Sequence, residues 1–156
     1  TRRSSDLKSR FSHDQICRSG EFVINLVSEK LLRSTDYCGV KSGRDTDKFA
    51  DCGLTATTAQ GLDRVPAVAE SPLSLSCKVR QVLELGSHDC FIAEIVAATA
   101  DQSLMDRNNR LRLDKAGLVA FSHGEYFSLG EVLGFFGFSV ARDKVLARRM
   151  SKKRPR

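Results

Sequence analysis

Residues 73–98 read LSLSCKVRQVLELGSHDCFIAEIVAA, and this stretch decides the fold class. Over 73–85 the odd positions are mostly apolar and most even positions are polar. This alternation with a period of two is typical of a long strand that has one solvent-exposed face. Gly86 and Ser87 make a turn, and the apolar, β-branched run 88–98 returns as a second strand. The sequence therefore predicts a long antiparallel hairpin.

Other short extended segments surround this hairpin. The apolar, β-branched run 21–27 is predicted to be a core strand. Pro66 and Pro72 bracket a short extended segment, and the stretches 118–127 and 135–140 are also predicted to be extended. Many short strands with glycine and proline turns, joined by a few short helices, favour a mainly β fold built as an antiparallel barrel.

The helices are predicted from their end signals. Ser12 and Gln15 form a capping box, so a helix is expected to run to Arg18 and to end at Gly20. Capping residues and glycine stops predict further short helices. These run from Ser28 to Gly39, from Asp47 to Gly53 and from Leu129 to Leu133.

The length and composition indicate one globular domain with a basic tail. The 156 residues are 41% hydrophobic and 28% charged, and a chain of this length can bury a single core. The net charge is +6, but residues 141–156 hold eight of the 25 basic residues and one acid. We expect a domain over 1–140 whose charge does not indicate nucleic-acid binding. A basic tail, 141–156, is expected to follow it and to be solvated and disordered. The alternative for this tail is that it binds RNA or DNA.

The cysteines and the apolar runs show which further classes of protein the sequence does not favour. Five cysteines, an odd number without a C-x-x-C pair, predict neither a zinc site nor a disulfide framework but reduced, mostly buried thiols. Cys38 and Cys90 have possible redox roles, but no neighbour in sequence marks either as an activated thiolate, and we expect both to be buried. No apolar run is long enough to span a bilayer, so we expect a cytoplasmic protein that does not enter membranes.

Seven segments, read in order, resemble the flavin reductase-like family of FMN-binding split-barrel proteins, of the flavoredoxin type. They occur in the order that is typical of the family, which makes a chance match improbable. The segments are FSHDQI at 11–16, SGEFVINL at 19–26, DYCG at 36–39, SGRDTDKF at 42–49, ESPL at 70–73, LGSHDCFIAE at 85–94 and the stretch 126–140.

The resemblance implies a split antiparallel β-barrel, Greek-key-like in strand order, that forms a homodimer and holds FMN near the subunit interface. It implies an oxidoreductase that moves electrons from NADH or NADPH through FMN to an acceptor, which the sequence does not identify. Members of the family have further strands ahead of the part that matches Phe11, and we expect those strands to be absent here. The alternative is therefore a truncated, non-catalytic split barrel that acts as a dimerisation or partner-binding module.

The resemblance also points to a phosphate site. Ser9, Arg10, Ser12 and His13 bring hydroxyls, a guanidinium and a helix N-terminus together, which suits the FMN phosphate. From spacing alone, an ordinary helix cap with a surface arginine is favoured. Lys48 could compensate the phosphate charge or face solvent.

Two further residues are candidates for the flavin ring. The resemblance gives His88 a catalytic role, as a donor to a flavin carbonyl or a guide for the nicotinamide, beside the alternative of a structural hydrogen-bonding residue. Tyr126 could stack near the isoalloxazine or pack the end of the barrel. No residues are assigned to a metal.

Overall fold

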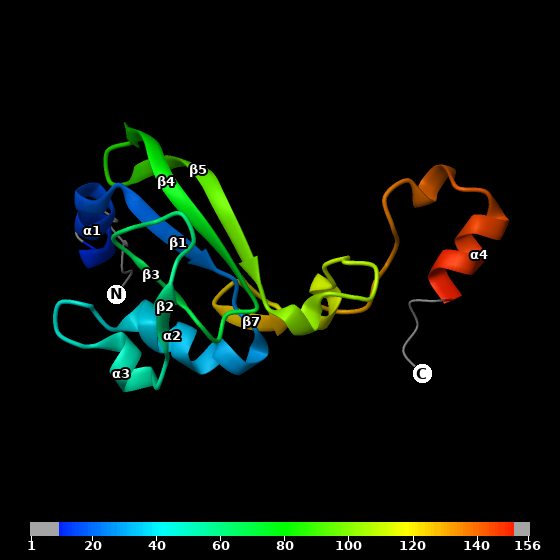
Figure 1. Cartoon of the computed structure of the whole chain (residues 1–156), viewed down its shortest axis with the longest axis horizontal. Coiled ribbons are helices and arrows are strands. Elements are labelled where there is room, and N and C mark those ends of the chain that lie inside the picture. The colour runs from blue at the N-terminus through cyan, green and yellow to red at the C-terminus, as the bar shows by residue number, and fades with distance from the viewer. Residues whose placement is uncertain (1–9, 152–156) are drawn as a thin grey trace.

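The structure is a computed structural model and describes residues 10–151. In this range one three-stranded and two two-stranded sheets combine with short helices (Figure 1). The strands are β1 (Glu21–Asn25), β2 (Ala56–Thr58), β3 (Pro66–Val68), β4 (Leu73–Glu84), β5 (Asp89–Ala100), β6 (Val119–Ser122) and β7 (Glu125–Ser128). The α-helices are α1 (Phe11–Ser19), α2 (Leu32–Val40), α3 (Lys48–Cys52) and α4 (Asp143–Ser151). None of the helices in the described range is long and apolar enough to cross a membrane.

The predicted hairpin is confirmed as the centre of the largest sheet. β4 and β5 pair antiparallel along their length, and β1 pairs with the other edge of β4, which gives the order β1-β4-β5. At the tip, Gly86 has a φ of 80°, and the Leu85 N–H donates to the His88 carbonyl at 2.9 Å. β5 begins at Asp89, so His88 belongs to the turn and does not open the strand.

The face of β4 that was predicted to be solvent-exposed is buried where the strand begins. Ser74 and Ser76 are 8% and 2% exposed. They lie opposite Asn25 and Val23 of β1, and Val23 packs against the residues of the β2–β3 layer. Ser74 Oγ donates to Asn25 Oδ1 at 2.9 Å. The prediction is wrong here because small hydroxyl side chains fit beneath a second layer and find hydrogen-bond partners inside it.

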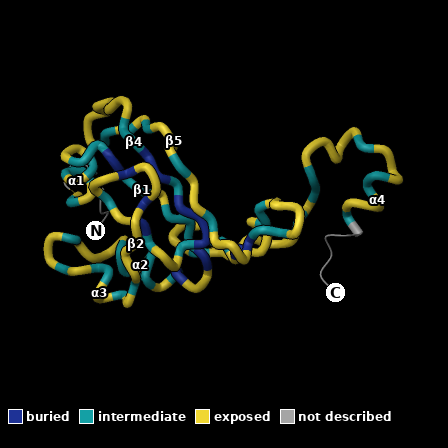
Figure 2. The backbone as a smooth tube through the Cα atoms, viewed as in Figure 1, coloured by how far each residue is buried: buried dark blue, intermediate teal, exposed yellow. Residues whose placement is uncertain are grey.

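A small core lies between β1 and the connection from β2 to β3. Ala59, Leu62 and Ala67 are 3%, 7% and 5% exposed, and Val23 and Val65 pack against them. Figure 2 shows buried segments in the body of the molecule, whereas the arm that follows β7 is exposed or half-buried throughout its described length. The apolar layer that holds the β2–β3 pair to the sheet is therefore narrow.

Glu21 fastens the loop between β2 and β3 to the start of β1. Its Oε2 atom accepts hydrogen bonds from the N–H groups of Asp63 and Arg64 at 3.1 and 3.0 Å, and Lys78 Nζ lies 3.7 Å from its Oε1 atom. Burial alone would raise the pKa of the Glu21 carboxyl. The two N–H donors and the lysine charge outweigh burial and hold this pKa below its ordinary value of 4.5.

The lowered pKa predicts how stability depends on pH. A carboxyl whose pKa is lower in the folded state stabilises the fold above its unfolded-state pKa, and this contribution is lost as the pH falls through the folded-state pKa. Glu21→Gln is therefore expected to lower the melting temperature at about pH 7 and to leave it nearly unchanged at about pH 3. Melting curves followed by circular dichroism check this, with the exposed Glu131→Gln as control. Equal losses at both pH values in Glu21→Gln would contradict the assignment.

The ends of the first three helices follow tertiary contacts as well as local signals. α1 begins at Phe11, and its N-cap, Arg10, makes no side-chain capping bond, so the predicted Ser12 capping box is wrong. The Arg10 guanidinium instead reaches the Gly39 carbonyl of α2 at 3.1 Å, which draws the start of α1 towards that helix. α2 continues through Gly39 to Val40. The prediction for α3 is confirmed, since Asp47 Oδ1 accepts from the first-turn N–H groups.

The segment after β7 differs from the prediction. Residues 129–135 are irregular where a helix was predicted, and Phe138–Val140 form a 3-10 turn where a strand was predicted. Glycines at 130, 134 and 137 interrupt both regular patterns.

The basic tail that was expected to be disordered contains α4, at the end of an arm that stands away from the body (Figure 1). Asp143 lies in the first turn of α4, and Arg148 and Arg149 lie in its last turn. Each charge complements the nearer end of the helix dipole, which favours the helix.

Candidate functional site

The start of α1, the end of α2 and the start of α3 meet at one junction. Arg10 Nη1 donates to the Gly39 carbonyl of α2 at 3.1 Å, and Lys48 Nζ donates to the Cys38 carbonyl of the same helix at 2.6 Å. Two cationic side chains that are 38 positions apart in sequence therefore reach adjacent carbonyls. Among the predicted phosphate residues, Arg10 and Lys48 meet at this junction, Ser12 and His13 lie in the first turn of α1, and Ser9 lies outside the described residues.

The loop that joins α2 to α3 closes over the first turn of α1. Arg44 Nη2 donates to Asp14 Oδ2 at 2.7 Å, and the Arg44 guanidinium lies 5.6 Å from the centre of the Phe11 ring. A Cβ atom at Gly43 would come within 3.0 Å of Phe11 Cδ1, so a larger residue there would press on this ring. Among residues 10–151 no side chain caps the N-terminus of α1, and the positive end of its dipole lies next to Arg10.

His13 connects α1 to the hairpin. Its Nε2 atom donates to Asp89 Oδ2 at 2.8 Å, and the two side chains are 14% and 7% exposed. The Phe91 ring centre lies 5.5 Å from that of His13, and Asp14 Oδ1 lies 3.8 Å from the other ring nitrogen. His13 is thus a structural hydrogen-bonding residue in this arrangement, and Nδ1 is its remaining nitrogen atom for a ligand.

His88 lies next to Asp89, in the turn at the tip of the hairpin. Its Nδ1 atom lies 2.8 Å from Ser87 Oγ, and its side chain is half-buried. Through the bond between Asp89 and His13, the hairpin tip is held at the side of α1. His88 is therefore connected to the first turn of α1 through its neighbour Asp89 and the bond from Asp89 to His13.

Tyr126 reaches α2 from β7. Its hydroxyl donates to Asp36 Oδ1 at 3.1 Å, and its ring centre lies 4.9 Å from that of Phe121. Burial raises the pKa of the Tyr126 phenol, and the carboxylate of Asp36 raises it further. The phenol is therefore protonated near neutral pH and acts as a hydrogen-bond donor. Asp36 lies one helical turn before Gly39, so Tyr126 and Arg10 contact neighbouring turns of α2.

Four residues of this region were not singled out from the sequence. They are Asp14, Asp36, Arg44 and Asp89, each of which contacts a predicted site residue or the loop beside it. The only signal that could have found them was that all four lie inside family-like segments. Their pairings span 30 to 90 positions, and spacing gives no information at that range.

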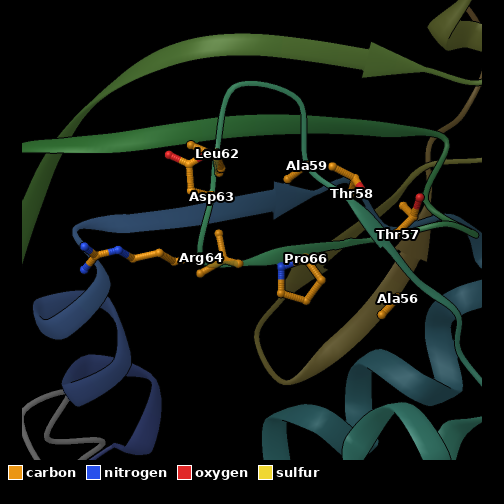
Figure 3. Close-up of a pocket in the computed structure, with 9 residues that line it drawn as sticks. Ala56, Thr57, Thr58, Ala59, Leu62, Asp63, Arg64 and Pro66 are labelled. Carbon is orange, nitrogen blue, oxygen red and sulfur yellow. The ribbon is translucent and has the colours of Figure 1, made fainter.

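A separate hollow of about 550 Å³ lies beside the loop between β2 and β3. Its walls are residues 56–59 and 62–66, and Figure 3 shows the Arg64 side chain extending from it towards α1. None of the predicted site residues lines this hollow. Within residues 10–151, no group of three or more histidine, cysteine, aspartate or glutamate side chains could hold a metal ion.

The thiols are less buried than predicted. Cys77 is buried at 1% exposure, Cys38 and Cys52 are half-buried, and Cys17 and Cys90 are exposed. All five are free. The expectation of burial is therefore wrong for Cys90, because the half of the hairpin towards its tip is not covered by another layer.

The chain is similar in sequence to proteins of one family. Residues 5–130 match the flavin reductase like domain. An uncharacterized protein of Archaeoglobus fulgidus is 31% identical over 98 residues, which are 63% of this chain and 55% of that protein. The chain spans about half the length of the curated relatives it matches.

Solved structures agree with the sequence match. The flavoredoxin of Desulfovibrio vulgaris is 29% identical, with a TM-score of 0.79 over 86% of this chain and 72% of that one. An FMN-binding domain of a flavin reductases-like enzyme from Shewanella baltica is 25% identical, with a TM-score of 0.65 over 82% of this chain and 70% of that one. The chain therefore belongs to the flavin reductase-like family and has its mainly β, split-barrel fold.

Proposed function

We propose that the chain binds FMN and acts as a flavin reductase or flavoredoxin-like oxidoreductase, with NADH or NADPH as electron donor. The family match and the likeness to a flavoredoxin and to an FMN-binding domain support a flavin cofactor. The observation that carries the proposal is the junction of Arg10 and Lys48 with the uncapped N-terminus of α1.

The junction fits a phosphate group. A guanidinium has five N–H donors and an ammonium has three, so the bonds from Arg10 and Lys48 to α2 carbonyls leave donors for a phosphate. The N–H groups of Phe11 and Ser12 in the first turn would supply further donors, whereas that of His13 donates to the Arg10 carbonyl, and the dipole of this helix favours an anion there. In this proposal Arg10 and Lys48 bind the phosphate, Ser12 and His13 lie beside it, and the carbonyls of Cys38 and Gly39 fix both cations.

Tyr126 and His88 belong to the ring end of the proposed site. FMN, when bound, accepts a hydride from a nicotinamide and passes electrons on, which is chemistry that the protein itself does not supply. Tyr126 is held by Asp36 with its phenol protonated, so it orients and packs against a flat polar ring. His88 would donate a hydrogen bond at the ring edge or guide the nicotinamide.

The activity is tested by anaerobic reduction. Purified chain mixed with FMN is expected to bleach the flavin absorption band on addition of NADH or NADPH much faster than the same mixture without protein. Binding of FMN without faster bleaching would restrict the function to electron transfer through bound flavin.

A second candidate function is a dimerisation or partner-binding module that holds no flavin. The observation in its favour is that the strands of the described residues form three separate sheets and do not join into a closed barrel. The same mixture separates the two functions, because such a module would leave the rate of bleaching unchanged and would retain no FMN on gel filtration.

We also propose that the chain forms a homodimer through the apolar hairpin and the arm that follows β7. The exposed large apolar residues of the hairpin are Val82, Leu83, Leu85, Ile92, Ile95 and Val96. Those of the arm include Leu129, Leu133, Phe136, Phe138 and Val140. In the described range β5 is an edge strand of 12 residues, and an edge with apolar side chains favours pairing with another chain.

A charge on this edge is expected to break the dimer. Ile95 is 56% exposed, and a glutamate in its place would be buried without a partner in a dimer interface, which opposes association. Light scattering after gel filtration is expected to give twice the mass of the chain for wild type and the monomer mass for Ile95→Glu. Asn108→Glu adds the same charge on an exposed loop and should remain dimeric. A monomeric wild type would exclude the interface.

A further inference from the structure

Two half-buried cysteines lie on α2 and α3, which contact each other. Cys38 is in the last turns of α2, Cys52 is the last residue of α3, and Cys52 is near enough to act on the Cys38 thiol. Both thiols are free. The other three cysteines lie on different elements, α1, β4 and β5.

Two hydrogen bonds beside the thiols hold the helices in this arrangement. The residue before each cysteine takes part in the first, because the Tyr37 hydroxyl donates to Asp51 Oδ2 at 2.7 Å. In the second, Lys48 Nζ donates to the Cys38 carbonyl at 2.6 Å. Two hydrogen bonds beside the cysteines therefore join α2 to α3, and the 13 residues between the cysteines form a closed loop in the reduced protein.

We propose that Cys38 and Cys52 form a dithiol site that is oxidised by low-molecular-weight disulfides. In the first step one cysteine thiolate attacks the small disulfide, forms a mixed disulfide and displaces one small thiolate. In the second step the other cysteine attacks the protein sulfur of the mixed disulfide, closes the Cys38–Cys52 bond and displaces the second small thiolate. One small disulfide is reduced to two thiols, and the two protein thiols lose their protons and two electrons.

The environment of Cys38 sets the conditions for this exchange. Burial raises the pKa of its thiol, the neighbouring Cys52 raises it further, and the charge of Lys48 acts in the opposite direction. Because the thiolate is the attacking species, exchange is expected to become faster as the pH rises above neutrality. The site does not depend on flavin binding, and it belongs to the chain whether or not the proposed flavin function holds.

Peptide mapping tests the proposal directly. The reduced full chain is incubated at low protein concentration with oxidised glutathione at about pH 8.5, where thiolates form readily, and the remaining thiols are then alkylated. Trypsin separates the two cysteines onto peptides 34–41 and 49–64. The expected result is a linked pair of these peptides and a loss of about 2 Da for the closed pair. Separate alkylated or glutathionylated peptides, under conditions in which exposed Cys17 and Cys90 react, would overturn the proposal.

Two variants show which thiols close the bond. Cys38→Ser and Cys52→Ser are each expected to abolish the linked peptide and to leave the remaining cysteine as a mixed glutathione adduct or a free thiol. Cys90→Ser removes an exposed thiol elsewhere and should give the same linked peptide as wild type. A bond from Cys38 or Cys52 to Cys17 or Cys90 would contradict the assigned pair.

Discussion

Arg10→Ala is expected to weaken FMN binding roughly 10- to 100-fold, the loss that follows from removing one charge-assisted hydrogen bond. Arg10 is the N-cap of α1, and its guanidinium is fixed by the Gly39 carbonyl beside the uncapped first turn. Alanine would remove both the charge and the remaining donors at the proposed phosphate position. Equilibrium titration of FMN against wild type and variant measures the change.

The matched control is Arg18→Ala. Arg18 is exposed in the last turn of the same helix, so its removal changes the net charge equally without touching the junction. Circular dichroism shows whether each variant keeps its fold, because Arg10 also connects two helices. An equal loss of affinity in both variants would assign the effect to overall charge and would exclude a phosphate contact at Arg10.

Leu62→Ala is expected to reduce the free energy of unfolding by about 2–5 kcal/mol, as is usual for truncation of a buried leucine. Leu62 is 7% exposed and belongs to the small core that joins the β2–β3 layer to β1. It also lines the open hollow beside this loop, so water can enter the space that is left, and we expect the lower end of the range. Urea unfolding measures the difference.

Leu85→Ala is the control for this substitution. Leu85 is 65% exposed at the tip of the hairpin and has few neighbours to lose. Its truncation is expected to change the free energy of unfolding by less than about 0.5 kcal/mol. If both substitutions reduced the free energy of unfolding equally, the assignment of a core to the β2–β3 layer would be wrong.

Elements with strong local signals could be predicted from the sequence. The alternation over 73–85, with glycine at the turn, marks a long hairpin whatever surrounds it. In the same way, Asp47 and Gly53 form both ends of α3 through their own side chain and backbone. Short-range hydrogen bonds and left-handed glycines decide such elements, and neighbouring residues in sequence contain the information.

Elements decided by distant contacts could not be predicted in this way. Ser74 and Ser76 look like a solvated face, and only the β2–β3 layer above them makes that face buried. α1 begins at Phe11 and not at Ser12, and the Arg10 side chain before it contacts α2 instead of capping the helix. Residues 129–140 are apolar enough for a helix or a strand, but glycines and the lack of a covering layer leave them irregular.

In the candidate site, too, some features could be predicted from the sequence and others depend on distant contacts. The resemblance identified Arg10 and Lys48, which reach adjacent carbonyls of α2, and Ser12 and His13, which lie in the first turn of α1. It did not identify how they are held, because the bond from His13 to Asp89 spans 76 positions and that from Tyr126 to Asp36 spans 90. Residue types at motif positions can be read from a sequence, whereas the partners that orient them come from the fold.

The central claim, that this chain holds FMN, is tested most directly by titrating FMN with the purified protein and following the fluorescence of the flavin. The chain has no tryptophan, so the flavin provides the signal. The account predicts saturable quenching with a stoichiometry of one FMN per chain. Fluorescence that stays unchanged up to a large excess of folded protein would contradict it, and the partner-binding module would then be the function of this chain.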